Sequence, residues 1–294
     1  MTDIFDGCTL RPSTRALYTK NLLTLNNNRE ITSPTFLKDH AKVMQKIAHL
    51  KPTTQRGYII AAVTYLKCQP KQKKITQLIE QYTKTMNEMN AQLRTNNTKS
   101  DAESDNWMTQ EELKEKYNEL KEDIARFEKR KTLSEQEYQR LLQYIVLSLY
   151  YLTPPRRNSD YQNMKFGDSS DSSEYNYIDI PNERFIFNNY KTSKTYKQQM
   201  IDIPPHLMDA IRTYLRHVPE HAEFFLSRQD GQPLRHVNAI TRILNTAFGR
   251  RVGSSLLRKM YHTSKYADVM DELEKDAEKM GHSVDVVKSH YLKK

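Results

Sequence analysis

The sequence predicts a mainly α protein (α+β) of two domains, of which the second carries one small antiparallel β-sheet. Apolar residues recur at helical spacing through most of the chain, as in helices that pack one face against a core. Only two short stretches, 185–187 and 200–204, read as strands, and they are placed to form a hairpin. At 294 residues the chain can bury a sizeable core in one large or two ordinary domains.

The composition excludes several classes of protein. Mean hydropathy is −0.83 and no apolar run approaches the roughly 20 residues of a membrane-spanning helix, so we expect no membrane partner. No basic and apolar leader follows Met1, which predicts a protein that is not secreted and acts inside the cell, wherever its target lies. Cys8 and Cys68 are too few for a disulfide framework and lack the neighbours of a zinc site, so we expect two ordinary residues.

Residues 1–95 are predicted to form a bundle of four helices. Prolines at positions 12, 34 and 52 open three of them, and the fourth carries apolar residues from 75 to 89. The apolar stripes are interpreted as core. The net charge of +10 attracts polyanions, although a solvated basic surface gives the same charge. Five basic residues of the other faces are candidates for contact with a polyanion: Arg15, Lys20, Lys51, Arg56 and Lys67.

Residues 96–107 are polar and rich in turn formers, which predicts a linker before a second domain at 108–294. After a charged helix, Ser134 and Glu137 have the spacing of a capping box and open a buried helix. That helix ends at Pro154-Pro155, immediately before Arg156 and Arg157. A mobile loop is expected at 168–173, and further helices are expected at 206–217, 237–248, 254–266 and 268–280.

Five side chains suited to phosphate chemistry follow one another through this second domain: Arg157, a lysine of the stretch 190–197, Arg258, His282 and Tyr291. Arg157-Asn158-Ser159-Asp160-Tyr161 is similar to the Arg-x-Ser-Glu-Leu motif of the tyrosine recombinases, or phage integrases. Leu256-Leu257-Arg258 resembles the second arginine motif of that family. Gly281-His282-Ser283, with a tyrosine nine positions after the histidine, has the family's usual spelling.

The resemblance implies a helical core-binding domain that clamps DNA and a catalytic domain that breaks and rejoins DNA strands. In that chemistry Tyr291 attacks a phosphate and forms a 3′-phosphotyrosine, while Arg157 and Arg258 neutralise charge on the phosphate oxygens. His282 would hydrogen-bond a phosphate oxygen or help to move protons. Lys194, or Lys191 beside it, would protonate the departing 5′ oxygen. No metal or nucleotide cofactor is implied, because the arginines replace a divalent ion.

Arg156 is expected to bind DNA backbone phosphate, and Asp160 stands where the family has an acid that supports the arginine. Ser255 occupies the place of the family's histidine and is assigned to DNA contact, which leaves the general-base role open, with His262 as a substitute. The partner is double-stranded DNA, bound as a homo-tetramer on paired sites by a chain that is monomeric or weakly oligomeric when free. Only three residues follow Tyr291, so an exchanged C-terminal helix is not expected to hold the tetramer.

The motifs are most similar to those of integrases from large eukaryotic DNA viruses and their satellites, which predicts a site-specific recombinase. Two alternatives stay open. One is strand transfer by a single protomer, as in type IB topoisomerases or telomere resolvases. The other is a DNA-binding relative that has lost catalysis, to which Ser255 gives weight.

Overall fold

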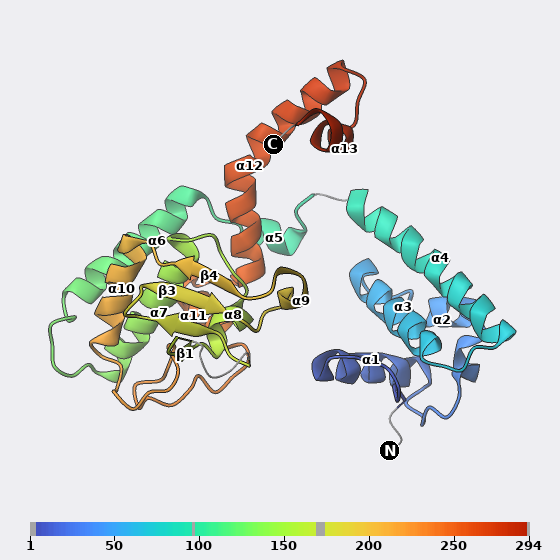
Figure 1. The fold of residues 1–294 in the computed structure, drawn as a ribbon, viewed down its shortest axis with the longest axis horizontal. Helices are drawn as coiled ribbons and strands as arrows, with labels where there is room; N and C mark the ends of the chain where they lie inside the picture. The colour runs from blue at the N-terminus through green and yellow to red at the C-terminus, as the bar shows by residue number, and fades with distance from the viewer. Residues whose placement is uncertain (1–3, 96–97, 169–173, 293–294) are drawn as a thin grey trace. The chain divides into compact units, whose positions relative to one another are not determined.

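The computed structural model describes residues 4–95, 98–168 and 174–292, and it divides into two compact units, Met1–Thr98 and Lys99–Lys294 (Figure 1). Both units are built mainly from helices, and the second contains a four-stranded sheet, so the predicted mainly helical class is confirmed. No helix in the described ranges combines the length and the apolar composition needed to cross a bilayer.

The first unit is a bundle of helices around one apolar core. Tyr82 is fully buried in that core, and its hydroxyl donates to the carbonyl of Leu37 at 3.0 Å. The helix predicted to begin at Pro34 differs from the structure, because it is a short 3-10 turn followed by a separate helix. Asp39 separates the two by accepting a hydrogen bond from the Lys42 N–H at 3.1 Å, as an N-cap residue does. The helices are α1 (Pro12–Leu25), η1 (Pro34–Leu37), α2 (His40–Ile47), α3 (Pro52–Lys67) and α4 (Lys73–Thr95).

Cys8 and Cys68 form a disulfide bond, so the expectation of two ordinary unpaired residues is wrong. Their Cα atoms lie 6.0 Å apart, within the range that a disulfide spans. The bond ties the N-terminal segment to the residue that follows α3, and the same segment buries Phe5 completely. Two cysteines 60 residues apart carry no signal of pairing in the sequence, because only the folded bundle brings them together.

The second unit is organised around α7, which packs against α6, α10 and α11. The predicted capping box at its start is confirmed, since the Ser134 N–H donates to Glu137 Oε2 at 2.8 Å and the Glu137 N–H donates to Ser134 Oγ at 3.3 Å. The two helices predicted at 254–266 and 268–280 are one continuous helix, α12. The helices are α5 (Asp101–Asn106), α6 (Gln110–Ala125), α7 (Glu135–Tyr151), α8 (Asn158–Gln162), α9 (Ser193–Tyr196), α10 (Pro205–Leu215), α11 (Ala239–Phe248), α12 (Ser254–Lys279) and α13 (Val284–Val286), followed by the π-helical turn η2 (Val287–Tyr291).

Helix α5 lies within the stretch predicted as linker, where Ser100 and Glu103 form a capping box at its start. This helix buries no side chain of its own, which explains why its polar residues show no helical stripe. Contacts with other parts of the second unit nevertheless hold the segment in place: Lys259 pairs with Glu103, and the Arg251 N–H donates to Asn106 Oδ1 at 2.8 Å.

The sheet has the strand order β1-β2-β3-β4, with strands β1 (Lys165–Phe166), β2 (Tyr177–Asp179), β3 (Arg184–Phe187) and β4 (Gln199–Asp202). The predicted hairpin is confirmed as the antiparallel pair β3 and β4, in which Phe185 lies opposite Ile201. Strands β1 and β2 are parallel, so the sheet is mixed and the prediction of an antiparallel sheet is wrong in this respect. These strands are too short to show alternation in the sequence. Apart from Asp168, the loop predicted at 168–173 lies outside the described residues.

Candidate active site

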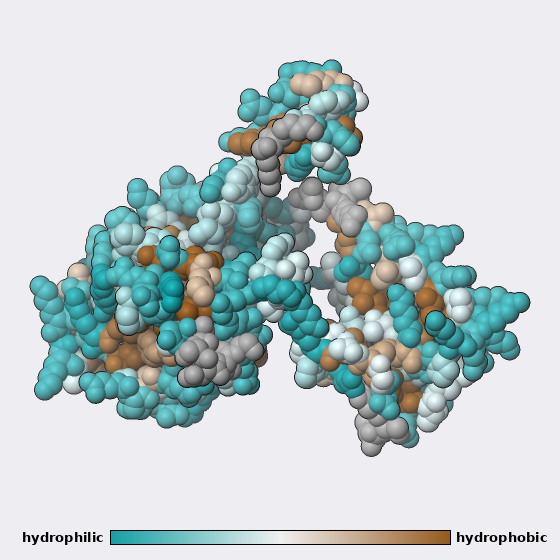
Figure 2. All heavy atoms as spheres, viewed as in Figure 1, coloured by the Kyte–Doolittle hydropathy of each residue, from teal (hydrophilic) through white to brown (hydrophobic). Residues whose placement is uncertain are grey.

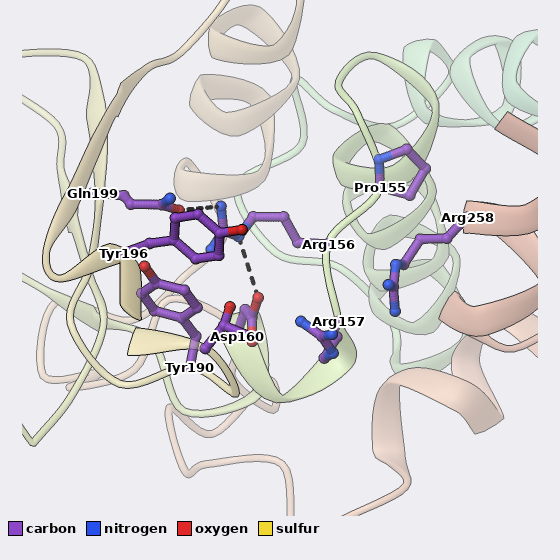
Figure 3. Close-up of a pocket in the computed structure, with 9 residues that line it drawn as sticks. Pro155, Arg156, Arg157, Asp160, Tyr190, Tyr196, Gln199 and Arg258 are labelled. Carbon is purple, nitrogen blue, oxygen red and sulfur yellow. Dashed lines mark hydrogen bonds and ion pairs between the residues drawn. The ribbon is translucent and has the colours of Figure 1, made fainter. Parts of the chain in front are cut away.

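A cavity of about 230 Å³ opens in the second unit where three parts of the chain meet (Figure 3). One part is the connection from α7 to α8, the second is the segment between β3 and β4 with the start of β4, and the third is the first turns of α12. The lining residues are Pro155, Arg156, Arg157, Asp160, Tyr190, Thr192, Tyr196, Gln199 and Arg258. Three guanidinium groups therefore face one small space.

Arg156 is held in place by its neighbours. Its Nε lies 3.2 Å from Asp160 Oδ2, and its Nη1 donates to Gln199 Oε1 at 3.1 Å. Its guanidinium carbon also lies 3.7 Å from the centre of the Phe187 ring, a cation–π contact. The Asp160 side chain is only 2% exposed, so this ion pair is shielded from water. Because its charge is already paired, Arg156 lines the cavity but is less available than an unpaired arginine to bind an anion.

Arg157 and Arg258 are free of such partners. Arg157 is the extended residue just before α8, and Arg258 lies one turn into α12. Both side chains are half-buried, and neither makes a hydrogen bond or ion pair with any other residue in the part of the chain that the structure describes. Figure 3 shows their guanidinium groups directed toward the same space. Two partly desolvated, unpaired guanidiniums make a site for an oxyanion such as phosphate, which can accept paired N–H bonds.

The predicted nucleophile does not lie at this cavity. The Tyr291 ring stacks on His282, with centroids 4.8 Å apart and planes inclined by 28°, but neither residue lines the cavity. Both follow α12, whose axis extends about 32 Å from Arg258 to Lys279 at 1.5 Å per residue. Figure 1 shows α13 beside the distal half of α12.

The segment that carries Tyr291 is exposed. Tyr291 is 60% exposed, Leu292 60% and Met280 66%. In Figure 2, brown apolar patches reach the surface among polar side chains at the end of α12 and in the residues after it. The predicted five-residue set is therefore split in this conformation, with the two arginines at the cavity and the histidine and tyrosine together elsewhere.

The lysines and Ser255 are near the cavity in sequence but do not line it. Lys191 and Lys194 are exposed in the segment between β3 and β4, which forms the short helix α9. Ser255 is exposed in the first turn of α12. His262 stacks on Tyr266, with ring centroids 6.0 Å apart, and it does not line the cavity.

In the first unit, the predicted DNA-contacting residues fall into two groups. Arg15 Nη2 donates to the carbonyl of Cys8 at 3.0 Å, and Arg56 Nε donates to Asn90 Oδ1, so both arginines join parts of the bundle. Lys51 and Lys67 are exposed, before and at the end of α3. Lys20 is exposed on α1.

Sequence reasoning missed the polar side chains that complete the cavity. Tyr190 is buried, and its hydroxyl donates to the Lys197 carbonyl at 2.8 Å, which fixes the segment around α9. Gln199 holds Arg156 from the start of β4. In the sequence, only the position of Tyr190 and Gln199 beside Lys191 and Lys194, in the predicted hairpin, could have pointed to them.

The comparisons with known proteins show a similarity of structure and none of sequence. No protein-family model matches the chain, and no curated protein matches it. Among solved structures, the chain is similar to "Crystal structure of XerA recombinase", with a TM-score of 0.36 and 13% sequence identity. That match covers 94% of this chain and 84% of the other.

Proposed function

We propose that this protein is a tyrosine-type DNA strand transferase that acts as a site-specific recombinase or integrase on double-stranded DNA. The observation that carries the proposal is the cavity in which Arg157 and Arg258, both unpaired among the described residues, face the same space. Their charges match a phosphodiester, and the basic net charge of the chain favours the same partner.

The scissile phosphate would lie between the two guanidiniums, which hold its non-bridging oxygens. The Tyr291 phenol gives its proton to His282, and its oxygen attacks phosphorus and becomes a 3′-phosphotyrosine. The bond to the 5′ oxygen breaks, and that oxygen takes a proton from Lys194 or Lys191. Attack by a 5′ hydroxyl on the phosphotyrosine reverses the step and rejoins a strand. The arginines neutralise charge that grows on the phosphate oxygens, so this chemistry requires no metal or nucleotide.

Arg156 supports this site from one side. Because its Nε and Nη1 are held by Asp160 and Gln199, it adds positive potential to the cavity without changing position. Asp160 in turn offsets part of that charge, which leaves Arg157 and Arg258 as the groups that attract the phosphate.

Cleavage requires Tyr291 to reach the cavity. In this proposal the segment that follows Arg258 changes position when DNA binds, or a second protomer on paired sites supplies the phenol. The exposure of Tyr291, and the few contacts of its segment with the rest of the unit, favour a movable nucleophile.

The second candidate is a DNA-binding protein that no longer cleaves. The separation of Tyr291 from the arginine cavity and the serine at position 255 favour this reading. Such a protein would bind a backbone phosphate at Arg157 and Arg258 and form no covalent bond.

The test uses a pool of nicked duplexes of random sequence, in which a cleaved strand loses its short end and cannot be rejoined. The wild-type chain is expected to form an adduct that survives denaturing electrophoresis, and Tyr291→Phe is expected to form none. Sequencing the attached strands would then give the target site. Duplex binding by the wild type without any adduct would support the second candidate instead, and absence of binding to the pool would contradict both.

A further inference from the structure

Asn158 connects four helices beside the arginine cavity. Its backbone N–H donates to Ser254 Oγ at 3.4 Å, its Nδ2 donates to Thr241 Oγ1 at 2.8 Å, and its Oδ1 accepts from the Tyr150 hydroxyl at 2.6 Å. Asn158 is the first residue of α8, and its three partners belong to α7, α11 and α12. One half-buried residue therefore connects α8 to the ends of the three neighbouring helices by hydrogen bonds.

The same residue bridges the two unpaired arginines. Arg157 immediately precedes Asn158, and Ser254 lies one helical turn before Arg258 on the same side of α12. The Asn158–Ser254 contact consequently links the backbone that carries one guanidinium to the helix that carries the other. Neither arginine has a side-chain partner among the described residues, so backbone placement sets how far apart the two groups lie.

We propose that Asn158 is a positioning residue for the oxyanion site: it fixes the spacing of Arg157 and Arg258 so that both reach one phosphate. This inference rests on the proposed function, because it assumes that the cavity receives a phosphate. It assigns no contact between Asn158 and the phosphate itself.

The side-chain chemistry explains why an asparagine suits this position. The junction needs one donor, toward Thr241, and one acceptor, toward Tyr150, and a carboxamide supplies both. Burial raises the pKa of Tyr150 well above its ordinary value, so this phenol stays protonated and keeps donating. An aspartate would lose the donor and place a negative charge next to Arg157, where it would compete with the phosphate.

The probe is inorganic phosphate, because it requires neither Tyr291 nor a DNA target site. Isothermal titration of the full chain with phosphate is expected to show binding in the wild type and none in Arg157→Ala or Arg258→Ala. Asn158→Ala is expected to bind about tenfold more weakly, as the loss of one or two hydrogen bonds that hold the spacing would produce. Thr241→Val, which keeps the shape of the threonine, removes one of these bonds and should weaken binding by about threefold to tenfold.

Asn182→Ala is the matched control, since Asn182 also bonds through its side chain but to Asp179, in the turn between β2 and β3. It should leave phosphate affinity within about twofold of the wild type. Thermal unfolding separates positioning from general damage, because Thr241→Val and Asn182→Ala are both expected to remain folded. A further readout is binding of random duplex at low salt, which should change little in Asn158→Ala because every basic charge remains.

Unchanged phosphate affinity in folded Asn158→Ala, or in Thr241→Val if the first variant does not fold, would overturn the inference and leave the proposed function standing. Equal losses in Asn182→Ala and Asn158→Ala would overturn it as well. Absence of phosphate binding by the wild type would also overturn the inference, because there would be no phosphate site for Asn158 to position. If the spacing effect is found but no DNA adduct forms, the inference stands and the catalytic part of the proposed function falls.

Discussion

Asp160 forms its ion pair with Arg156, at 3.2 Å, and leaves the neighbouring Arg157 without a side-chain partner among the described residues. The resemblance to the family motif assigns this acid to Arg157, but in the structure the acid pairs with Arg156, four residues before it. The cavity thus contains one arginine that is part of the structure and two that are available to an anion.

Asp160→Asn is expected to destabilise the second unit. The Asp160 carboxylate is 2% exposed, so losing its charge leaves Arg156 partly buried without its counter-ion. We expect a loss of about 2–4 kcal/mol in the free energy of unfolding, measured by urea denaturation. Glu183→Gln is the control, because Glu183 pairs with Arg212 on the surface and its loss should cost less than about 1 kcal/mol. Equal costs would mean that the buried pair has no special role.

Arg157→Ala and Arg258→Ala are expected to slow strand cleavage strongly without lowering stability. Their side chains bond to no other described residue, so thermal midpoints should change little. Strand cleavage in the adduct assay should fall by about 100-fold or more, as for removal of a group that stabilises transition-state charge. Arg156→Ala should differ from both, with a clear loss of stability. A variant of Arg157 that cleaves normally would contradict the assignment.

The helices of this chain could be predicted because their signals are local. Pro12 and Pro52 mark helix starts, and Ser134 with Glu137 forms the capping box that the spacing predicts. Strand β1 has only two residues, which is too short for any alternation to appear. The 3-10 turn at Pro34 was missed because it depends on a cap at Asp39 and not on the apolar pattern.

The candidate site could be predicted only in part, for a physical reason. Arg157 immediately precedes α8 and Arg258 lies in the first turns of α12, and both line one cavity. Tyr291 follows a helix that is mostly exposed beyond Met260, and few core contacts determine where its segment lies. The structure stacks the rings of His282 and Tyr291, which are nine positions apart in the sequence. The sequence spacing contained nothing about the distance from either residue to the arginines.

DNA affinity is expected to fall steeply with salt, and Lys51 and Lys67 are expected to contribute to that dependence. Both lysines are exposed, so each can release a counter-ion when it meets a phosphate. Lys51→Ala or Lys67→Ala should reduce the slope of log K against log salt by about 0.9 for each phosphate that the lysine no longer neutralises, measured by fluorescence anisotropy with random duplex. Lys165→Ala is the control, because Lys165 already pairs with Glu223. Salt-insensitive binding by the wild type would rule out a clamp built on Lys/Arg pairing with phosphates.

Asp179 is expected to make stability depend on acid pH. Burial alone would raise the pKa of this carboxyl, but hydrogen bonds from Asn182 and the Arg184 guanidinium outweigh burial and lower it. A carboxyl with a lowered folded-state pKa stabilises the fold above its unfolded-state pKa of about 3.9, and that contribution is lost as pH falls through the folded value. Asp179→Asn should therefore be less stable than the wild type at pH 7, with a gap in urea midpoint that narrows below about pH 4. The gap in urea midpoint between Arg184→Gln and the wild type should narrow over the same pH range. A gap that grows in acid would contradict a lowered pKa for Asp179.

Reduction of the Cys8–Cys68 disulfide is expected to destabilise the first unit. The bond closes a loop with a sequence separation of 60 residues, and in the chain-entropy model such a loop contributes about 4 kcal/mol by restricting the unfolded chain. Cys8→Ser, or dithiothreitol on the wild type, should therefore lower the thermal midpoint of this unit and release the segment that buries Phe5. Chain purified without reductant should react with a thiol reagent at neither cysteine and, after reduction, at both. Two reactive thiols before reduction would contradict the bond. The Cys8→Ser/Cys68→Ser double variant is the control, since its midpoint should no longer respond to dithiothreitol.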